Sequence, residues 1–276
     1  MATWLITGCS SGLGRHLAQA VLKHGDKAVV TARKLSAIQD IVTSYPDTAL
    51  ALQLDVTNSA QITQVVQQAE ERFGGVDVLV NNAGHGYRAA VEEADETEVD
   101  ELFATNFFGP VALIKAALPG MRKRGSGTIV NVSSIAARTT EPGSGYYAAT
   151  KCALEGMSRG LQKEVSPLGI SVIMVEPGGF RTDFADRSLL ESKTAIRDYA
   201  GTAGLRRKAN DKTGGHQLGD PARGAELIIK AVEAQDSPLL LALGSDAVQV
   251  INDALKADLS QVEAWEKESV ATDYPD

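Results

Sequence analysis

The chain has 276 residues, of which 43% are hydrophobic and 22% are charged, and its formal net charge at pH 7 is −8. This composition is ordinary for a soluble globular protein, and the acidic excess opposes binding to nucleic acid. Two cysteines and four scattered histidines provide neither a disulfide framework nor a metal-ligand spacing. No apolar run reaches the length of a membrane span and the first residues do not form a signal peptide, so we expect a cytoplasmic protein with no membrane partner.

The hydrophobic pattern alternates between strand-like and helix-like segments. The predicted strands are 4–7, 27–32, 49–54, 76–80, 128–132, 171–175 and 239–243, and the predicted helices are 13–23, 59–73, 96–121, 145–165, 221–234 and 246–268. Several strands are almost continuously apolar, which is typical of strands buried on both faces of a parallel sheet. We therefore predict an α/β fold, a doubly wound parallel sheet (Rossmann fold) of about seven strands with helices on both faces.

The whole chain, 1–276, is expected to form one nucleotide-binding and catalytic domain. The range 183–217 is polar and lacks strong periodicity, which is typical of a lid over a binding site. After it, Asp220 and Pro221 have the pattern of an N-cap and a first helical turn. The last predicted helix, at 246–268, would cover either the substrate side or a neighbouring subunit.

A glycine-rich turn, Thr7-Gly8-Cys9-Ser10-Ser11-Gly12-Leu13-Gly14, lies between the first predicted strand and the first helix. Glycines allow a tight turn in which backbone N–H groups approach a diphosphate at the helix N-terminus. Many glycine-rich turns only connect two elements, and the spacing here differs from Gly-x-Gly-x-x-Gly. The position after the first strand nevertheless predicts dinucleotide binding, with contacts from Gly8, Ser10, Ser11, Gly12, Leu13 and Gly14.

The end of the second predicted strand indicates which dinucleotide is bound. An acidic residue there would bind the ribose 2′-hydroxyl of NAD, but Ala32 takes that place and Arg33 and Lys34 follow. A guanidinium can hold a 2′-phosphate with two donors, so we expect NADP (NADPH), with NAD still possible. In the alternative interpretation Arg33 is only an exposed loop residue.

Two further groups of residues follow predicted strands. Asp55 and Val56 would lie near the adenine, although Asp55 could instead form a local turn or cap the next helix. Asn82, Ala83 and Gly84 suit a close approach to the cofactor, although such residues also simply end strands. The carboxyl ends of parallel strands are where ligands bind in open α/β sheets.

Tyr147 and Lys151 are one helical turn apart, and Ser134 lies thirteen residues upstream of the tyrosine. A fixed positive charge beside a phenol lowers its pKa, and the phenol can then exchange a proton with an alcohol or a ketone. The same spacing occurs by chance in many helices. The interpretation therefore depends on the nucleotide site.

Taken together, these motifs resemble the short-chain dehydrogenase/reductase (SDR) family, in its compact single-domain branch. The resemblance covers residues 7–182 and includes the glycine turn, Asn106 in a helix and the Pro177-Gly178 segment that ends at Thr182. It implies that Tyr147 is the proton donor or acceptor, that Lys151 lowers its pKa and binds the nicotinamide ribose, and that Ser134 holds the substrate oxygen. Ser133 is the local rival for that role.

The resemblance also implies that Asn106 holds a water that links Lys151 to solvent, whereas the alternative is a buried amide bonded to backbone. Pro177, Gly178 and Phe180 would line the nicotinamide, and Thr182 would bind its carboxamide. A homodimer or homotetramer is implied through the helices that carry Asn106 and Tyr147.

We therefore expect an NADP(H)-dependent oxidoreductase that interconverts a small-molecule alcohol and its carbonyl compound. The substrate pocket would be formed by His85 and Tyr87, by 135–146 and by the lid at 183–217. Two alternatives are a family member that acts on a carbon–carbon double bond or isomerises its substrate, and a non-catalytic NADP-binding sensor.

Overall fold

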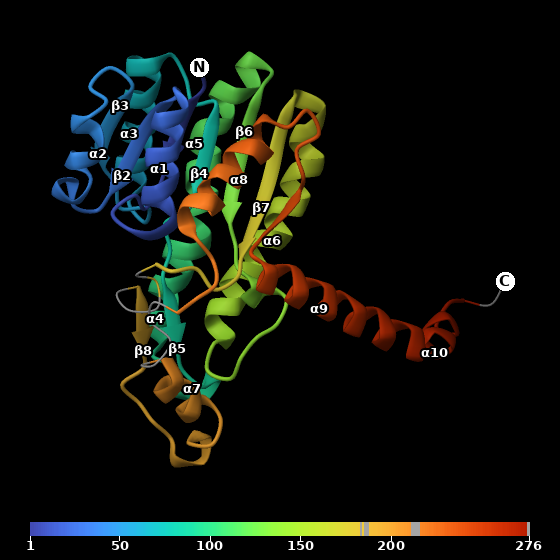
Figure 1. The fold of residues 1–276 in the computed structure, drawn as a ribbon. Helices are drawn as coiled ribbons and strands as arrows, with labels where there is room; N and C mark the ends of the chain where they lie inside the picture. The colour runs from blue at the N-terminus through green and yellow to red at the C-terminus, as the bar shows by residue number, and fades with distance from the viewer. Residues whose placement is uncertain (183, 185–187, 211–215, 275–276) are drawn as a thin grey trace.

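Seven parallel strands form the central sheet, in the order β3-β2-β1-β4-β6-β7-β9 (Figure 1). The computed structural model describes residues 1–182, 184, 188–210 and 216–274. The strands are β1 (Thr3–Ile6), β2 (Lys27–Ala32), β3 (Ala49–Gln53), β4 (Val78–Asn81), β6 (Gly127–Val132), β7 (Ile170–Pro177) and β9 (Leu240–Leu243). The predicted fold class is confirmed, and each predicted strand lies within two residues of its observed bounds.

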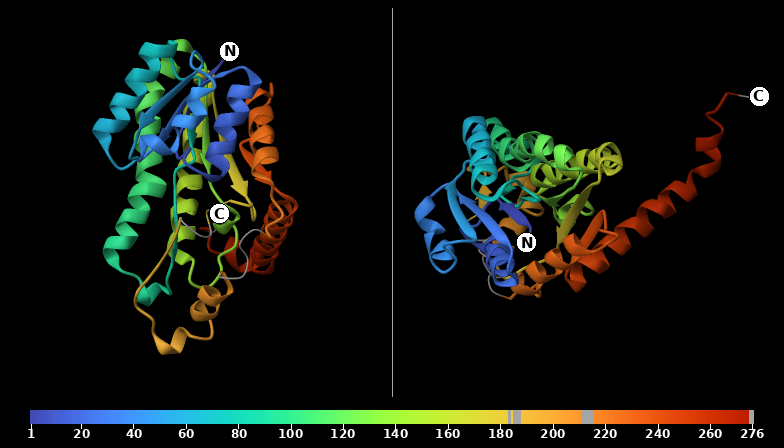
Figure 2. Two further views of the ribbon diagram at one scale, coloured as in Figure 1. Left: turned by 60° about the vertical axis from the view of Figure 1, so that its left-hand side comes forward. Right: turned by 90° about the horizontal axis from the view of Figure 1, so that it is seen from above.

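Helices cover both faces of the sheet, as the view from above shows (Figure 2). One layer contains α1 (Gly12–His24), α2 (Gln39–Thr43) and α8 (Pro221–Glu233), and the other contains α3 (Ser59–Phe73), α5 (Gly109–Arg124) and α6 (Gly145–Val165). Successive residues of a strand point to opposite layers. In β1, Trp4 and Ile6 belong to the first core and Leu5 to the second, which explains why the strands are apolar throughout.

The helix predicted at 96–121 is interrupted. It consists of α4 (Glu96–Phe103), a π-helical segment (Ala104–Phe108) and α5, and the π-helical segment carries Asn106. By length and hydropathy, the stretch Glu96–Arg124 could cross a membrane, which the sequence pattern did not lead us to expect. Several of its apolar side chains pack in the second core instead, namely Leu113, Ile114, Ala117 and Met121, whereas Leu102 belongs to another cluster and Phe108 is exposed.

A smaller assembly lies beyond the carboxyl ends of the sheet (Figure 1). It contains the paired strands β5 (Gly86–Arg88) and β8 (Leu189–Glu191) and the helix α7 (Ala203–Asn210). Residues 183, 185–187 and 211–215 of the predicted lid lie outside the described residues. The sequence did not predict β8 and α7, because a three-residue strand and a short polar helix leave almost no hydrophobic pattern.

The C-terminal helix projects away from the body of the molecule (Figures 1 and 2). The single helix predicted at 246–268 is divided at Trp265 into α9 (Ser245–Ala264) and α10 (Glu266–Val270). Ala247 and Ile251 anchor its first turns, whereas the apolar side chains further along are exposed. The predicted cap of α8 is confirmed, since Asp220 accepts hydrogen bonds from the Ala222 and Arg223 amides.

Candidate active site

The carboxyl ends of β1, β4, β6 and β7 meet at one edge of the sheet, where the glycine turn also lies. The strand order reverses between β1 and β4, because β2 and β3 extend the sheet to one side and β6, β7 and β9 to the other. A crevice at such a switch point is where open α/β sheets bind their ligands. The topology therefore brings the predicted cofactor residues to the same edge as Ser134.

The glycine turn is held by the side chain of Asn82, the residue that directly follows β4. Gly8 and Gly12 have φ angles of 72° and 58°, a conformation that favours glycine. The Asn82 amide donates to the carbonyl oxygens of Thr7 (2.8 Å) and Gly8 (3.3 Å). A β carbon on Gly14 would lie 2.3 Å from the Asn82 nitrogen, so only glycine fits there. Asn82 thus shapes the turn with its side chain.

The outer side of the turn fits a dinucleotide. Ser10 is exposed and Ser11 immediately precedes α1, a 13-residue helix whose N-terminus favours a phosphate. A β carbon on Gly12 would lie 3.4 Å from Thr182, so the turn and the segment after β7 approach one another across this edge. The cradle of backbone amides and hydroxyls is suited to a diphosphate.

Arg33 and Lys34 are exposed directly after β2, which agrees both with the NADP interpretation and with the alternative that Arg33 is only an exposed loop residue. Hydrogen bonds from Thr57 and, to a smaller extent, the charge of Arg33 lower the pKa of Asp55, whereas burial is the main cause that lowers the pKa of His85. The Asp55 carboxylate accepts from the Thr57 amide (2.9 Å) and hydroxyl (2.7 Å). This is the local turn that was the alternative for Asp55, and its contact with adenine stays a prediction.

Ser134, Tyr147 and Lys151 meet at the carboxyl end of β6. Lys151 Nζ donates to the Val132 carbonyl oxygen (2.9 Å) and lies 5.7 Å from the centroid of the Tyr147 ring. The Ser134 hydroxyl lies close enough to the Tyr147 phenol to oppose, in part, the rise in the pKa of this phenol that burial causes. The structure thus brings together the three residues on which the sequence interpretation depended.

The protonation of this trio differs from our expectation that Lys151 lowers the pKa of Tyr147. Part of the tyrosine is accessible, but its phenol is buried, and burial raises the pKa of Tyr147 to about 12. Burial also lowers the pKa of Lys151 to about 8, against the opposing charge of Glu155. In this structure desolvation therefore dominates the pKa of both groups.

The neighbouring Ser133 points to a different partner. Its hydroxyl is buried and donates to Glu155 Oε1 (2.7 Å). Ser134 Oγ accepts a hydrogen bond from the Ala136 amide (3.1 Å) and retains its own proton for a further acceptor. The geometry therefore favours Ser134, the residue chosen by the thirteen-residue spacing, over its rival.

Asn106 is buried behind the trio. Its amide oxygen accepts from the His85 N–H (3.0 Å), and its nitrogen donates to the His85 carbonyl (2.9 Å) and to the Thr150 hydroxyl (3.2 Å). A β carbon on Gly84 would lie 3.0 Å from the Asn106 oxygen and 3.7 Å from Lys151 Nζ. Asn106 is thus bonded to backbone and also lies near Lys151, and the water relay stays a prediction.

The segment after β7 is held by a residue that sequence reasoning did not identify as part of the site. Asp246, at the start of α9, accepts from the Gly179 amide (2.7 Å), and a β carbon on Gly178 would lie 2.3 Å from its carboxylate. The ring of Phe180 packs against Gly224 of α8 in the first core. Contact of Pro177, Gly178, Phe180 and Thr182 with a nicotinamide stays a prediction.

The expected substrate wall is only partly as predicted. Tyr87 is fully buried and its hydroxyl donates to Glu98 (2.8 Å), so its place in the pocket wall was wrong. Because side chains alternate along the short strand β5, the Tyr87 side chain points into a third apolar cluster. Phe184 takes a position beside the reactive phenol instead, with its ring centroid 5.9 Å from that of Tyr147.

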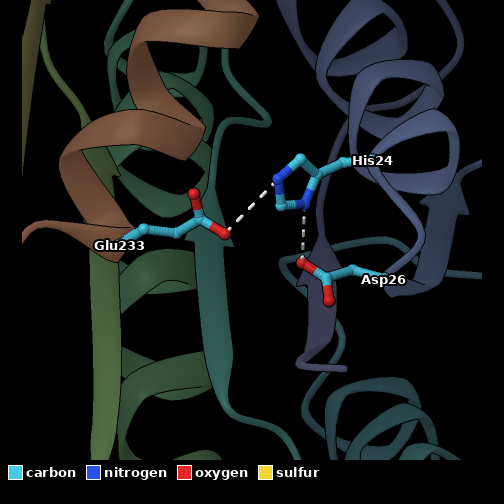
Figure 3. A group of neighbouring side chains, drawn as sticks. All are labelled: His24, Asp26 and Glu233. Atoms are coloured by element: carbon cyan, nitrogen blue, oxygen red, sulfur yellow. Dashed lines mark ion pairs between the residues drawn. The ribbon is translucent and has the colours of Figure 1, made fainter.

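A separate group of titratable side chains lies at the amino-terminal end of the sheet (Figure 3). The His24 ring stands between two carboxylates, with Nδ1 3.5 Å from Asp26 and Nε2 3.5 Å from Glu233. Asp26 also accepts from the Ala2 amide (2.8 Å) and the Trp4 indole (3.3 Å). An imidazole with one carboxylate on each side joins α1 to α8 by ion pairs, and it lies far from the glycine turn.

The chain is similar to known proteins over its whole length. A family model described as short chain dehydrogenase matches residues 2–192. A 3-ketodihydrosphingosine reductase of Bacteroides thetaiotaomicron is 44% identical over 197 residues, which are 71% of each chain. A short-chain dehydrogenase from Streptomyces avermitilis has 43% identity and a TM-score of 0.92 over 99% of this chain and 100% of that one. An alcohol dehydrogenase from Thermococcus sibiricus has 25% identity and a TM-score of 0.71 over 88% and 95%.

Proposed function

The chain belongs to the short-chain dehydrogenase family and is an oxidoreductase, and from this premise we propose that it uses NADP(H) to interconvert a carbonyl compound and its alcohol. One observation carries the proposal. Ser134, Tyr147 and Lys151 converge beside the glycine turn, with a protonated phenol next to a serine hydroxyl. A proton donor and a hydroxyl at one point are what a carbonyl oxygen needs when its carbon accepts a hydride.

The residues at the edge of the sheet fit NADP(H). The glycine turn and the N-terminus of α1 would hold the diphosphate, and Arg33 and Lys34 would hold the 2′-phosphate, where Ala32 leaves no opposing carboxylate. The structure from Thermococcus sibiricus is described as a complex with 5-hydroxy-NADP, which supports this choice. When bound, the cofactor supplies the hydride.

The residues of the chain would then position the substrate and move one proton. Ser134 would donate a hydrogen bond to the carbonyl oxygen, and Tyr147 would transfer its phenolic proton to that oxygen. Lys151, held by the Val132 carbonyl, would stabilise the negative charge that the phenol acquires. Thr182 and Asp246 would fix the segment that closes over the cofactor, the latter through the Gly179 amide.

We propose that reduction of a ketone is the favoured direction. The Tyr147 phenol is protonated at neutral pH and can donate its proton to a carbonyl oxygen, as reduction requires. The relative from Bacteroides thetaiotaomicron carries the name of a reductase that acts on a 3-keto group, which supports the same direction. The Phe184 ring beside Tyr147 would favour an apolar group next to the carbonyl.

A panel of ketones, aldehydes and secondary alcohols tests this function. The purified chain is mixed with each compound and with NADPH or NADH, and the absorbance of the reduced nicotinamide is followed. We expect turnover of at least one ketone, faster with NADPH. If the chain binds NADPH but oxidises none of it with the whole panel, carbonyl reduction is excluded and the double-bond or sensor alternative takes its place.

A further inference from the structure

Three consecutive residues at the end of β6, Val132 to Ser134, each contact one residue from the same face of α6. Tyr147, Lys151 and Glu155 are spaced by four, so they project from the same side of the helix. Tyr147 meets Ser134, Lys151 donates to the carbonyl of Val132, and Glu155 accepts from Ser133. Glu155 is therefore the next member of the series that contains the proposed proton donor and its lysine.

Glu155 is also part of a buried ionic cluster. It is 5% exposed, and its second carboxylate oxygen lies 2.8 Å from the guanidinium of Arg138. The same guanidinium binds Glu176 of β7 through Nε (3.0 Å) and a terminal nitrogen (2.5 Å), and Glu176 is 0% exposed. Arg159, which is half exposed, is 3.9 Å from Glu155 on the outer side. Arg138 thus joins the ends of β6 and β7 to α6.

Lys151 is a further buried charge beside this cluster. Two carboxylates, Glu155 and Glu176, share the half-buried guanidinium of Arg138, and Glu176 holds it by more contacts than Glu155 does. The Lys151 ammonium is 5% exposed and one helical turn from Glu155, and the two groups attract each other. Burying an ammonium is unfavourable unless an opposite charge lies near it.

We propose that Glu155 is a positioning residue whose carboxylate supplies the counter-charge for the Lys151 ammonium and, through Ser133, fixes the end of β6 from which Ser134 projects. The inference rests on the proposed function for its catalytic meaning only, because the contacts of Glu155 with Ser133 and Arg138 exist whatever the protein catalyses. Glu155 acts on Lys151 and Ser134, and it is not placed to touch the substrate. Among the described residues, the other ionisable groups near this pair are Tyr147 and Cys152 on α6, His85 from the loop after β4, Arg138, Arg159 and Glu176.

The test is to follow the Lys151 proton directly by ¹³C NMR of lysine-labelled protein, with the Lys151 signal assigned from a Lys151→Met variant. Wild-type protein should show the Lys151 signal titrating near pH 8. Burial and the neighbouring Glu176 raise the pKa of Glu155 to about 7, so a second, smaller inflection is expected there. In Glu155→Gln the small inflection should vanish, and Lys151 should titrate about one unit lower, since an adjacent opposite charge shifts a pKa by about that much or more.

The matched control is Glu164→Gln, which removes an exposed carboxylate from the same helix and should leave the Lys151 titration unchanged. An unchanged Lys151 titration in folded Glu155→Gln would overturn the proposal, even if that variant lost stability or turnover. Should Glu155→Gln not fold, Glu155→Met, which puts an apolar side chain of similar volume in place of the carboxylate, is measured in the same way, and an unchanged Lys151 titration in it would overturn the proposal. These measurements need no turnover, so failure of the carbonyl panel would leave them standing.

Discussion

Ser133 and Ser134 are adjacent, and substituting each by alanine should have opposite consequences. Ser134→Ala removes the hydroxyl that faces Tyr147, and loss of one such donor to a developing oxyanion reduces kcat by about 100- to 1,000-fold. It also removes the hydrogen bond from the Ala136 amide, 3.1 Å long and partly buried, which is worth about 1 kcal/mol. We therefore expect a nearly normal melting temperature.

Ser133→Ala should show the reverse. Its hydrogen bond to Glu155 is 2.7 Å long and buried, and a bond to a charged group contributes about 1.5–3 kcal/mol. Because Arg138 still binds Glu155, the lower part of that range applies, and Tm should fall by about 4 °C in a chain of this size. Turnover at pH 7 should fall by less than about tenfold. Steady-state kinetics and thermal unfolding of both variants test whether Ser134 or Ser133 holds the substrate oxygen. A large rate loss in Ser133→Ala with little loss in Ser134→Ala would refute the assignment of this role to Ser134.

Three more predictions follow from the same geometry. Arg33→Ala should weaken NADPH binding by about 10- to 100-fold and NADH binding hardly at all, as measured by fluorescence titration; equal losses would remove the argument from the 2′-phosphate. Gly14→Ala would place a β carbon 2.3 Å from the Asn82 amide, so it should cost about 1–3 kcal/mol of stability in thermal unfolding and weaken NADPH binding, and a fully stable variant would contradict the packing described. The rate of reduction should be level up to about pH 8 and fall above it as Lys151, whose pKa is lowered to about 8, loses its proton; a rate that stays level to about pH 9.5 would show that the charge is not needed.

The strands and the trio could be predicted because their signals are local. Continuous apolar runs such as Val172 to Val175 reflect burial on both faces of the sheet. The four-residue step from Tyr147 to Lys151 fixes a common helix face whatever the rest of the fold is. Ser134 could be chosen because side chains alternate at a strand end, and its neighbour is indeed turned to Glu155.

The features that the sequence did not reveal depend on contacts between distant segments. Asp246 meets the Gly179 amide across 67 positions, and Arg138 meets Glu176 across 38, so no local pattern marks either pair. The pKa of Tyr147 was predicted in the wrong direction because the lysine is visible in the sequence and the depth of burial is not. Glu155 could have been found, because it continues the four-residue series after Lys151.

The most direct test of the whole account is to measure NADPH binding and ketone reduction by Tyr147→Phe, which deletes only the phenolic oxygen. The account predicts NADPH affinity within about twofold of wild type and a loss of turnover of at least about 100-fold, because the proton donor is gone while the cofactor site remains. Turnover close to that of the unaltered protein would contradict the claim that this phenol supplies the proton.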